Sequence, residues 1–129
     1  MSLPQQNHLA LKYYVAYAAS LAAAASPAIP VTGRGRVVDI RFTPLVSPTT
    51  NPTVITPKVG ATQMQLNGSN ITMSIAAATT AITGVVSLQP NGLNIVDVGD
   101  VIVLTSNAGA ANAASVPGYY TVVVDERSI

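Results

Sequence analysis

The side chains that could carry chemistry in this sequence are few and lie far apart along the chain. His8 is the only histidine and there is no cysteine, so a Ser-His-Asp triad would have to draw its base from near the amino terminus. Asp125 and Glu126 are adjacent, and adjacent residues of a strand point to opposite faces, which prevents the facing carboxylate pair of a glycosidase. These residues provide no catalytic set, so we expect a protein that is not an enzyme.

One polar series has the composition of a cation site. Asparagine and aspartate recur at every third position and offer oxygen atoms of the kind that Ca²⁺ binds: Asn91, Asn94, Asp97 and Asp100. The same side chains also stabilise tight turns by bonding to nearby backbone groups, an explanation that needs no ion. We therefore expect turns and no cofactor, with a cation site as the alternative.

The composition favours a protein that works within an assembly. The chain has 129 residues, which is the size of one compact domain with an extension. Charged residues make up 9% of it, against about 25% in ordinary globular proteins, while 49% are hydrophobic. A surface with so little charge provides weak repulsion between molecules. We expect a homo-oligomer, either a dimer or a trimer.

The few charges are unevenly divided along the chain. Residues 1–64 carry five basic residues and one acidic residue, a net charge of +4, whereas residues 65–129 carry one basic and four acidic residues, a net charge of −3. So few basic residues, with almost no aromatic residues among them, do not make a nucleic-acid surface. A basic region that meets an acidic protein surface fits better, and its members are Arg34, Arg36, Arg41 and Lys58.

Residues 13–30, YYVAYAASLAAAASPAIP, hold no charged side chain. Alanine is too weakly hydrophobic for a membrane span, and Pro27 and Pro30 would break its second half. The uncharged residues before Lys12 make a poor start for an export signal. Alanine, leucine and lysine favour helix, so the sequence predicts a helix from about Asn7 to Ala25.

This predicted helix is apolar on nearly every side. Such a helix must be covered on more than one face, so we expect it to dock on another protein through its largest apolar side chains, Tyr13, Tyr14, Tyr17 and Leu21. Packing of the helix on the chain's own sheet is the alternative.

After Pro30 the pattern changes. In RVVDIRF, residues 36–42, Val38, Ile40 and Phe42 alternate with Val37, Asp39 and Arg41, which predicts a half-buried strand. The four prolines of TPLVSPTTNPTVITPK, residues 43–58, favour an extended, polyproline-like arm without backbone hydrogen bonds.

From Thr62 onward the sequence predicts strands. Asn67-Gly68 lies between two alternating apolar runs and indicates a hairpin, and Asn91-Gly92 indicates another turn. The nearly continuous apolar runs at residues 101–104 and 119–124 are typical of central strands. We expect a mainly β protein of about seven strands, a β-sandwich or small β-barrel of jelly-roll type. Residues 1–58 would form the helix, one strand and the arm, and residues 59–129 the main β body.

Part of the second half resembles a family. In NIVDVGDVIVLTSNAGAANAASVPGYYTVVVDE, a Gly-Asp turn at Gly99-Asp100 starts a hydrophobic strand from Val101 to Leu104, a small-residue loop follows, and the strand from Gly118 to Val122 pairs back. This pattern is similar to one in bacteriophage structural proteins. With the Ala-rich segment and the low charge, the whole chain resembles the small cement or decoration proteins of phage heads.

The resemblance implies a function. A protein of this family would lie on the outside of the capsid, bind the major capsid protein or other virion subunits, and stabilise the shell by non-catalytic contacts without nucleic acid or membrane as partner. Two alternatives from other classes stay open: a secreted adhesin or fibre module that binds a sugar or a host surface through its rim loops, and a small hydrolase or metal-dependent enzyme.

The basic residues generate a prediction about salt. If Arg34, Arg36, Arg41 and Lys58 contact an acidic partner, binding should weaken as salt rises, because exposed charges are screened over about 8 Å at physiological ionic strength. Binding measured at low and high salt tests this, and equal affinities would remove the role. Folding of the isolated protein serves as the control, since surface pairs contribute only about 0–1 kcal/mol each.

Overall fold

The computed structural model describes residues 11–19, 26–45, 53–75, 86–106 and 117–126. Strands account for 68% of these residues and helix for almost none, so the expected mainly β class is confirmed. All strand pairs are antiparallel, and neither of the two large sheets closes on itself. The alternative of a small closed barrel therefore does not hold for the described residues.

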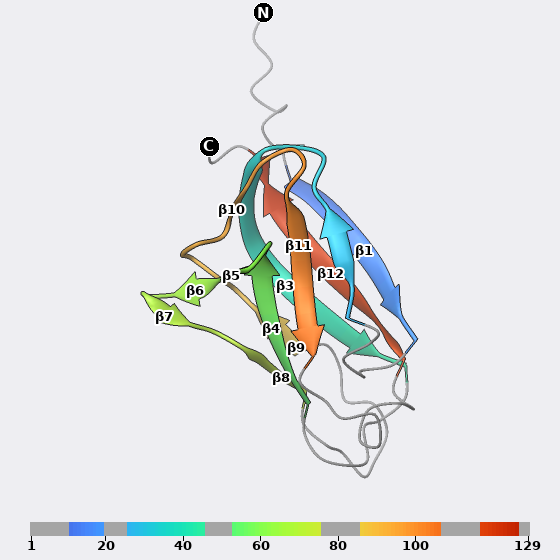
Figure 1. Ribbon diagram of the computed structural model, residues 1–129. Coiled ribbons are helices and arrows are strands. Elements are labelled where there is room, and N and C mark those ends of the chain that lie inside the picture. Colours follow the sequence, from blue (N-terminus) through green and yellow to red (C-terminus); the bar gives the residue numbers. More distant parts are fainter. Residues whose placement is uncertain (1–10, 20–25, 46–52, 76–85, 107–116, 127–129) are drawn as a thin grey trace, which may run out of the picture.

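Two five-stranded sheets form the body of the molecule (Figure 1). The first sheet has the order β1 (Leu11–Ala18), β12 (Gly118–Asp125), β3 (Gly35–Pro44) and β10 (Ile95–Val96), with β9 (Val86–Leu88) also paired to β3. The second sheet has the order β2 (Ala28–Pro30), β11 (Val101–Ser106), β4 (Thr53–Val59) and β5 (Thr62–Gln63), with β8 (Met73–Ile75) also paired to β4. A small hairpin of β6 (Gln65–Leu66) and β7 (Ser69–Asn70) completes the described strands.

The pairings are nested along the chain. β1 pairs with β12, β2 with β11, β3 with β9 and β10, and β4 with β8. The chain is thus a long antiparallel ribbon, folded so that β12 also pairs with β3 and β11 with β4. Strands from the two ends of the sequence are therefore neighbours in space, as the blue and red strands of Figure 1 show.

One hydrophobic core lies between the two sheets. Alternate residues of each strand point into it, as the pleat of a strand requires. Phe42 and Tyr120 of the first sheet form its aromatic centre, with ring centroids 4.8 Å apart. The other fully buried side chains come from both sheets and from the segment before the β6–β7 hairpin. They are Val37, Ile40, Val96, Val122 and Val124 of the first sheet, Ile55, Met73, Ile75, Ile102 and Leu104 of the second sheet, and Met64.

A bulge in β3 changes which of its residues are buried. The partner of Val123 is Asp39 and the partner of Val124 is Val37, so Val38 is an extra residue in the ladder. Val37 is fully buried and Val38 only partly, the reverse of the predicted alternation, whereas Ile40 and Phe42 point inward as predicted. A bulge shifts the face of every residue on one side of it, and strict alternation in the sequence does not reveal one.

The predicted N-terminal helix is wrong where the structure describes the chain. Leu11–Ala18 is strand β1, paired along its whole length with β12. Its large residues fit a strand with period 2, since Tyr14 and Ala16 pack on the core and Ala18 is buried, while Tyr13 and Val15 face outward. The hydrogen-bonded ladder with β12 stabilises the strand and overrides the helix propensity of alanine and leucine. Residues 7–10 and 20–25 of the predicted helix lie outside the described residues.

The predicted Pro-rich arm is also wrong in part. Thr53–Val59 is strand β4, which pairs with β11, β5 and β8. Thr53, Ile55 and Pro57 are buried, and the residues between them are partly exposed, so the segment alternates like any half-buried strand. The Pro57 carbonyl accepts a hydrogen bond from the Met64 N–H at 2.9 Å. Residues 46–52 of the predicted arm lie outside the described residues.

Other expectations about the strands are confirmed. Asn67 and Gly68 have φ angles of 52° and 83°, as the two central residues of a type I′ hairpin turn require, and they join β6 to β7. The runs at 36–42, 101–104 and 119–124 are β3, β11 and β12, and the last two are central strands.

One expected pairing does not form. β11 and β12 lie in different sheets, so the strand that starts at Gly118 does not pair back on the strand after Asp100. Strands from both sides of residue 58 also share each sheet, because β3 pairs with β12 and β4 with β11. The predicted division at residue 58 stays a prediction about domains, but the sheets do not follow it.

Gly118 provides a test of the packing between β12 and β3. A Cβ atom there would lie 2.6 Å from Phe42 Cε1 and 2.7 Å from the Thr43 carbonyl oxygen, and Phe42 is fully buried. We expect Gly118→Ala to lower the free energy of unfolding by about 1–3 kcal/mol, measured by urea denaturation, because neither neighbour can move freely.

Gly33→Ala is the matched control for this substitution. The atoms nearest to its added Cβ belong to the Glu126 carboxylate, which is the far end of a flexible side chain. We expect little change in stability there. Equal effects of the two substitutions would contradict the packing that we describe around Phe42.

Candidate functional site

The outer face of the first sheet carries an exposed apolar surface. Paired residues of antiparallel strands share a face, and the register places Tyr13 beside Val123, Val15 beside Thr121 and Tyr17 beside Tyr119. The exposed fractions of the large side chains are 57% for Tyr13, 64% for Val15, 56% for Tyr17 and 41% for Tyr119. We call these four residues the tyrosine face.

Two of its tyrosines contact each other across the strands. The rings of Tyr17 and Tyr119 have centroids 5.3 Å apart and an interplanar angle of 58°. Tilted aromatic pairs of this kind are favourable and present a broad apolar surface with hydroxyl groups that can bond to a partner. The tyrosine face therefore has the composition that protein interfaces favour.

The opposite side of β1 holds this face in place. The Tyr14 hydroxyl lies 3.2 Å from Thr32 Oγ1 and accepts a hydrogen bond from the Thr32 N–H at 3.2 Å. Lys12 Nζ also donates to Thr32 Oγ1 and lies 5.7 Å from the centroid of the Tyr14 ring. These contacts tie β1 to the segment between β2 and β3, so β1 is held by more than its ladder with β12.

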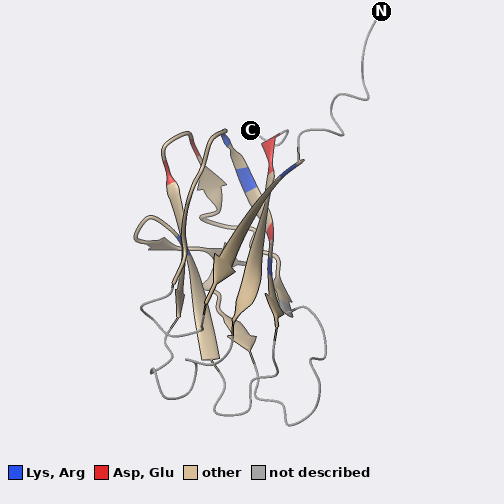
Figure 2. Ribbon diagram, turned by 90° about the vertical axis from the view of Figure 1, so that its right-hand side faces the viewer, with Lys and Arg blue, Asp and Glu red and all other residues tan. Residues whose placement is uncertain are grey.

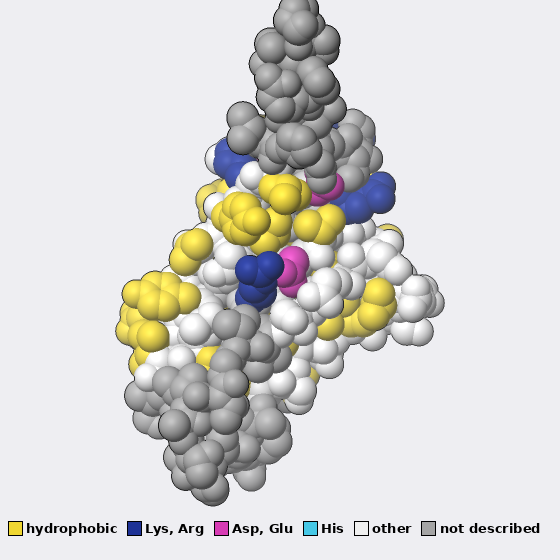
Figure 3. Space-filling model, turned by 180° about the vertical axis from the view of Figure 1, so that it is seen from behind, with side chains coloured by type: hydrophobic (Ala, Val, Ile, Leu, Met, Phe, Trp, Pro, Cys, Tyr) yellow, Lys and Arg dark blue, Asp and Glu magenta, His cyan; other side chains and the backbone are white. Residues whose placement is uncertain are grey.

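Polar groups border the tyrosine face on β3. Arg41 is the partner of Thr121, and its Nε donates to Asp39 Oδ2. Gln89 Nε2 donates to Asp39 Oδ1 at 3.1 Å. Figure 3 shows this side of the molecule, with hydrophobic side chains gathered around a basic and an acidic group. The mixture of an apolar area with a polar border is typical of a binding surface.

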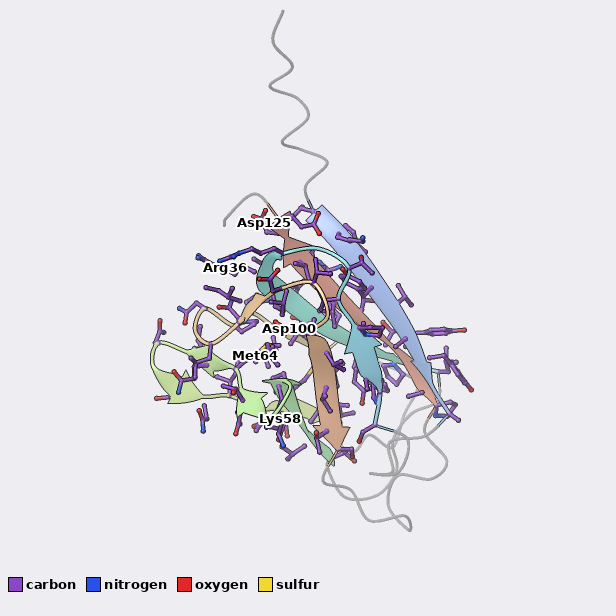
Figure 4. The ribbon with its side chains drawn as sticks, turned by 45° about the horizontal axis from the view of Figure 1, so that its top comes forward. Arg36, Lys58, Met64, Asp100 and Asp125 are labelled. Atoms are coloured by element: carbon purple, nitrogen blue, oxygen red, sulfur yellow. The ribbon has the colours of Figure 1, made fainter. Side chains whose placement is uncertain are left out.

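The basic residues predicted to contact a partner are not brought together. Arg36 and Arg41 lie on β3 in the first sheet, Arg34 lies between β2 and β3, and Lys58 lies on β4 in the second sheet. Arg34 Nη1 is 3.6 Å from Asp97 Oδ2, so this charge has an acidic neighbour. Figure 4 shows Arg36 near Asp125 and away from Lys58. Figure 2 shows basic and acidic residues mixed in the upper half of the molecule.

The tyrosines predicted as anchors are only partly placed as expected. Tyr13 and Tyr17 are exposed on the outer face, whereas Tyr14 is partly buried against the core. Leu21 lies outside the described residues. The sequence interpretation missed Val15 and Tyr119 as members of the same surface. The alternation of YYVAY with period 2 is the signal that would have found Val15, and only the register with β12 identifies Tyr119.

The asparagine and aspartate series stabilises turns. Asn94 is buried, and its Nδ2 donates to the Val37 carbonyl at 2.6 Å. Asp100 Oδ2 accepts the Asp97 N–H at 2.8 Å, which closes the turn between β10 and β11. Asn91 Oδ1 accepts the Asn67 N–H at 2.7 Å and joins the two Asn-Gly turns. Among the described residues no group of three or more His, Asp and Glu side chains could hold a metal ion.

A shallow pocket lies between β10 of the first sheet and β4 and β5 of the second sheet. Its volume is about 300 Å³, and Val59, Thr62, Leu93 and Ile95 line it. Leu93 has a φ angle of 49°, which is uncommon for a residue with a side chain, and is more than half exposed. The lining holds one hydroxyl group and no charged side chain, so the pocket offers little to orient a polar ligand.

Comparisons of the chain with protein-family models, with curated proteins and with solved structures found no match. In the part of the chain that the structure describes, no helix is long and apolar enough to span a membrane.

The adjacent residues Tyr119 and Tyr120 generate a prediction about pH. Burial raises the pKa of the Tyr120 hydroxyl well above its usual value of about 10. The folded state therefore resists ionisation, and this contribution to stability is complete below about pH 10 and declines as the pH rises from there towards the pKa of the folded state. We expect the wild-type protein to lose stability above about pH 10, and Tyr120→Phe to lose less over the same range.

Tyr119→Phe is the control for this measurement, because Tyr119 is exposed on the opposite face of β12. Its free energy of unfolding should follow the wild-type dependence on pH. Identical pH profiles for the two variants would show that ionisation of Tyr120 does not limit stability.

Proposed function

We propose that this chain is a structural virion protein, a decoration protein that binds the outside of a capsid and stabilises it by contacts with the major capsid protein. The observation that carries the proposal is the tyrosine face, a large exposed apolar surface on a chain with little charge. Isolated exposed hydrophobic residues are common, but a contiguous group on one rigid sheet is typical of a protein–protein contact.

The tyrosine face fits a strong contact with another protein. Tyrosine is enriched among the residues that dominate binding energy, because it buries a large area with few rotatable bonds. The four residues of the face carry no charge, so covering them removes no ion from water. The polar border around Asp39 and Arg41 would then form the rim that fixes orientation.

The strand order supports the finer interpretation of the fold as a jelly roll. In an eight-stranded jelly roll, a long antiparallel ribbon pairs the first strand with the eighth, the second with the seventh, the third with the sixth and the fourth with the fifth. If β9 and β10 are counted as one strand, and β5–β7 as an insertion between β4 and β8, the nested pairs of this chain follow that order. Jelly rolls occur in viral capsid proteins, and also in lectins and cupins, so the fold alone does not select a function.

The adhesin alternative depends on different parts of the molecule. It would bind a sugar or a host surface through rim loops, and residues 107–116, between β11 and β12, lie outside the described residues. The pocket lined by Leu93 and Ile95 is apolar and does not favour a sugar. We therefore keep sugar binding as an outcome of the experiment.

A binding experiment tests the proposed function. First, mass spectrometry of particles purified from the native source should find this chain in a fixed ratio to the major capsid protein. Second, capsids stripped of the chain should bind the wild-type protein, and the double variant Tyr17→Ser and Tyr119→Ser should bind at least about tenfold more weakly, since two interface tyrosines are lost.

Val98→Ser is the matched control, because Val98 is 68% exposed but lies on the turn between β10 and β11, away from the tyrosine face. It should bind like the wild type. Absence of the chain from the particles, or unchanged capsid binding by the double variant, would contradict the proposal. Binding of wild-type protein to a glycan array, lost in the double variant, would favour the adhesin instead.

A further inference from the structure

In the part of the chain that the structure describes, strand β1 forms an open edge of the first sheet. Among the described residues it pairs with β12 alone. The Leu45 N–H donates to the Pro117 carbonyl at 2.9 Å, which fixes the phase of the ladder between β3 and β12. Since hydrogen-bonded pairs alternate along an antiparallel ladder, Tyr119, Thr121 and Val123 turn their backbone groups to β3, and the residues between them turn theirs to β1.

The same alternation continues into β1. Its even-numbered residues, from Lys12 to Ala18, bond to β12, and its odd-numbered residues turn their N–H and C=O groups to the open edge. The edge groups thus belong to Leu11, Tyr13, Val15 and Tyr17, whose side chains also lie on the outer face. β1 therefore presents a row of backbone donors and acceptors together with an apolar face.

Natural proteins usually protect such an edge. Charged side chains, proline, a bulge or a very short strand prevent other chains from adding to it. β1 has eight residues, contains no proline, shows no bulge in its ladder with β12, and carries Lys12 as its only charge. Because none of these devices blocks the stretch from Tyr13 to Ala18, this edge is suited to receive another strand.

We propose that the occupant of this edge is β1 of a second copy of this chain, paired antiparallel about a two-fold axis that passes midway between the two Val15 residues. A two-fold axis perpendicular to the sheet keeps both outer faces on the same side. Residues with edge-facing backbone groups must then lie opposite each other, so odd-numbered residues pair with odd-numbered residues. Full overlap, with Leu11 opposite Ala18, breaks this rule.

An axis at Val15 satisfies the rule and matches the side chains. It places Val15 opposite Val15, and Tyr13 opposite Tyr17 of the second copy, which are favourable β-branched and aromatic cross-strand pairs. On the inner side it places Tyr14 opposite the small Ala16. An axis at Tyr14 also satisfies the rule, but it sets the two Tyr14 side chains directly opposite each other.

Charge favours the same register. With the axis at Val15, Lys12 lies opposite Ala18 of the second copy, so the two lysines are six residues apart along the strands, roughly 20 Å at the rise of a β-strand. With the axis at Tyr14 they are only four residues apart. The self-paired edge therefore contains no close pair of like charges. Like charges directly opposite each other would destabilise the pairing of a strand with itself.

The dimer would join the first sheets of two copies into one continuous sheet. Its outer side would carry two tyrosine faces next to each other, with the contact of Tyr17 and Tyr119 repeated on both sides of the axis. This inference needs only the edge and its register, and it does not rest on the virion role. Failure of capsid binding and failure of dimer formation are thus separate results.

Oligomeric state and charge substitution test the inference. Light scattering after size-exclusion chromatography should show a dimer of the full chain at micromolar concentration. Val15→Lys should raise the dissociation constant at least about 100-fold, because it places two like charges opposite each other at the axis. Val98→Lys, at another exposed valine, should leave the dimer unchanged. Val15→Lys should still unfold cooperatively, with a Tm close to that of wild-type protein diluted below its dissociation constant, because a dimer adds stability that depends on concentration.

A mixing experiment tests the symmetry itself. Val15→Lys and Val15→Asp should each be monomeric alone, and a mixture of the two should form a heterodimer, since only a two-fold axis at this position sets residue 15 opposite itself. Failure of the mixture to associate would overturn the register. A dimer that survives Val15→Lys would show that the second copy binds elsewhere.

Amide hydrogen exchange of the wild-type protein provides a test without substitution. The amides of Tyr13, Val15 and Tyr17 should become protected as the protein concentration rises, with no change for exposed amides of the β6–β7 hairpin. A monomer or a trimer at about 100 μM would overturn the proposal. Protection that is independent of concentration would also overturn it, because a segment of the same chain, such as residues 1–10, would then cover the edge.

Discussion

The position of β12 between β1 and β3 is the constraint on which the rest of the structure depends. β12 pairs with β1 over its whole length on one side and with β3 on the other, so it joins the N-terminal part of the chain to the C-terminal part. Its alternation sends Tyr120, Val122 and Val124 into the core and leaves Tyr119 on the surface. The register of β1 on β12 then decides which side chains of β1 meet Tyr119. Both the core and the tyrosine face follow from this one ladder.

The two sides of the first sheet show how a small chain divides its apolar residues. A domain of this size buries only about two thirds of its extended surface, and two sheets enclose a single core. Phe42 and Tyr120 fill that core, and Gly118 is required beside them because a side chain there would meet Phe42. Four of the large apolar residues that do not fit inside, Tyr13, Val15, Tyr17 and Tyr119, lie together on the outer face of the first sheet, whereas others, such as Leu45, Leu93 and Val98, are exposed elsewhere. Contiguous exposed apolar side chains of this kind are typical of surfaces that take part in protein–protein contacts.

Several polar side chains of the described residues hold turns and strands together. The asparagine and aspartate series closes the turns before β11, and Asn67 and Asn91 bond to each other across two turns. Tyr14, Lys12 and Thr32 fix β1 to the following segment. The tyrosine face, in contrast, consists of exposed side chains that lie together on the outer side of the first sheet. Our proposed function therefore depends on contacts of this surface.

The sequence by itself determined the local features whose physical causes are local. Asn67-Gly68 specifies a tight hairpin turn through its positive φ angles, and the β-branched runs of β3, β11 and β12 specify strands. Tertiary structure decided the rest. Leu11–Ala18 contains good helix formers, yet it is a strand because β12 pairs with it along its whole length, from Ala18 with Gly118 to Leu11 with Asp125, far away in the sequence. The bulge at Val38, the strand Thr53–Val59 within a Pro-rich segment, and the meeting of Tyr17 with Tyr119 likewise depend on partners distant in sequence. Propensity acts over a few residues, whereas register is set by the whole sheet, so Tyr119 could be assigned to the tyrosine face only after the strands were paired.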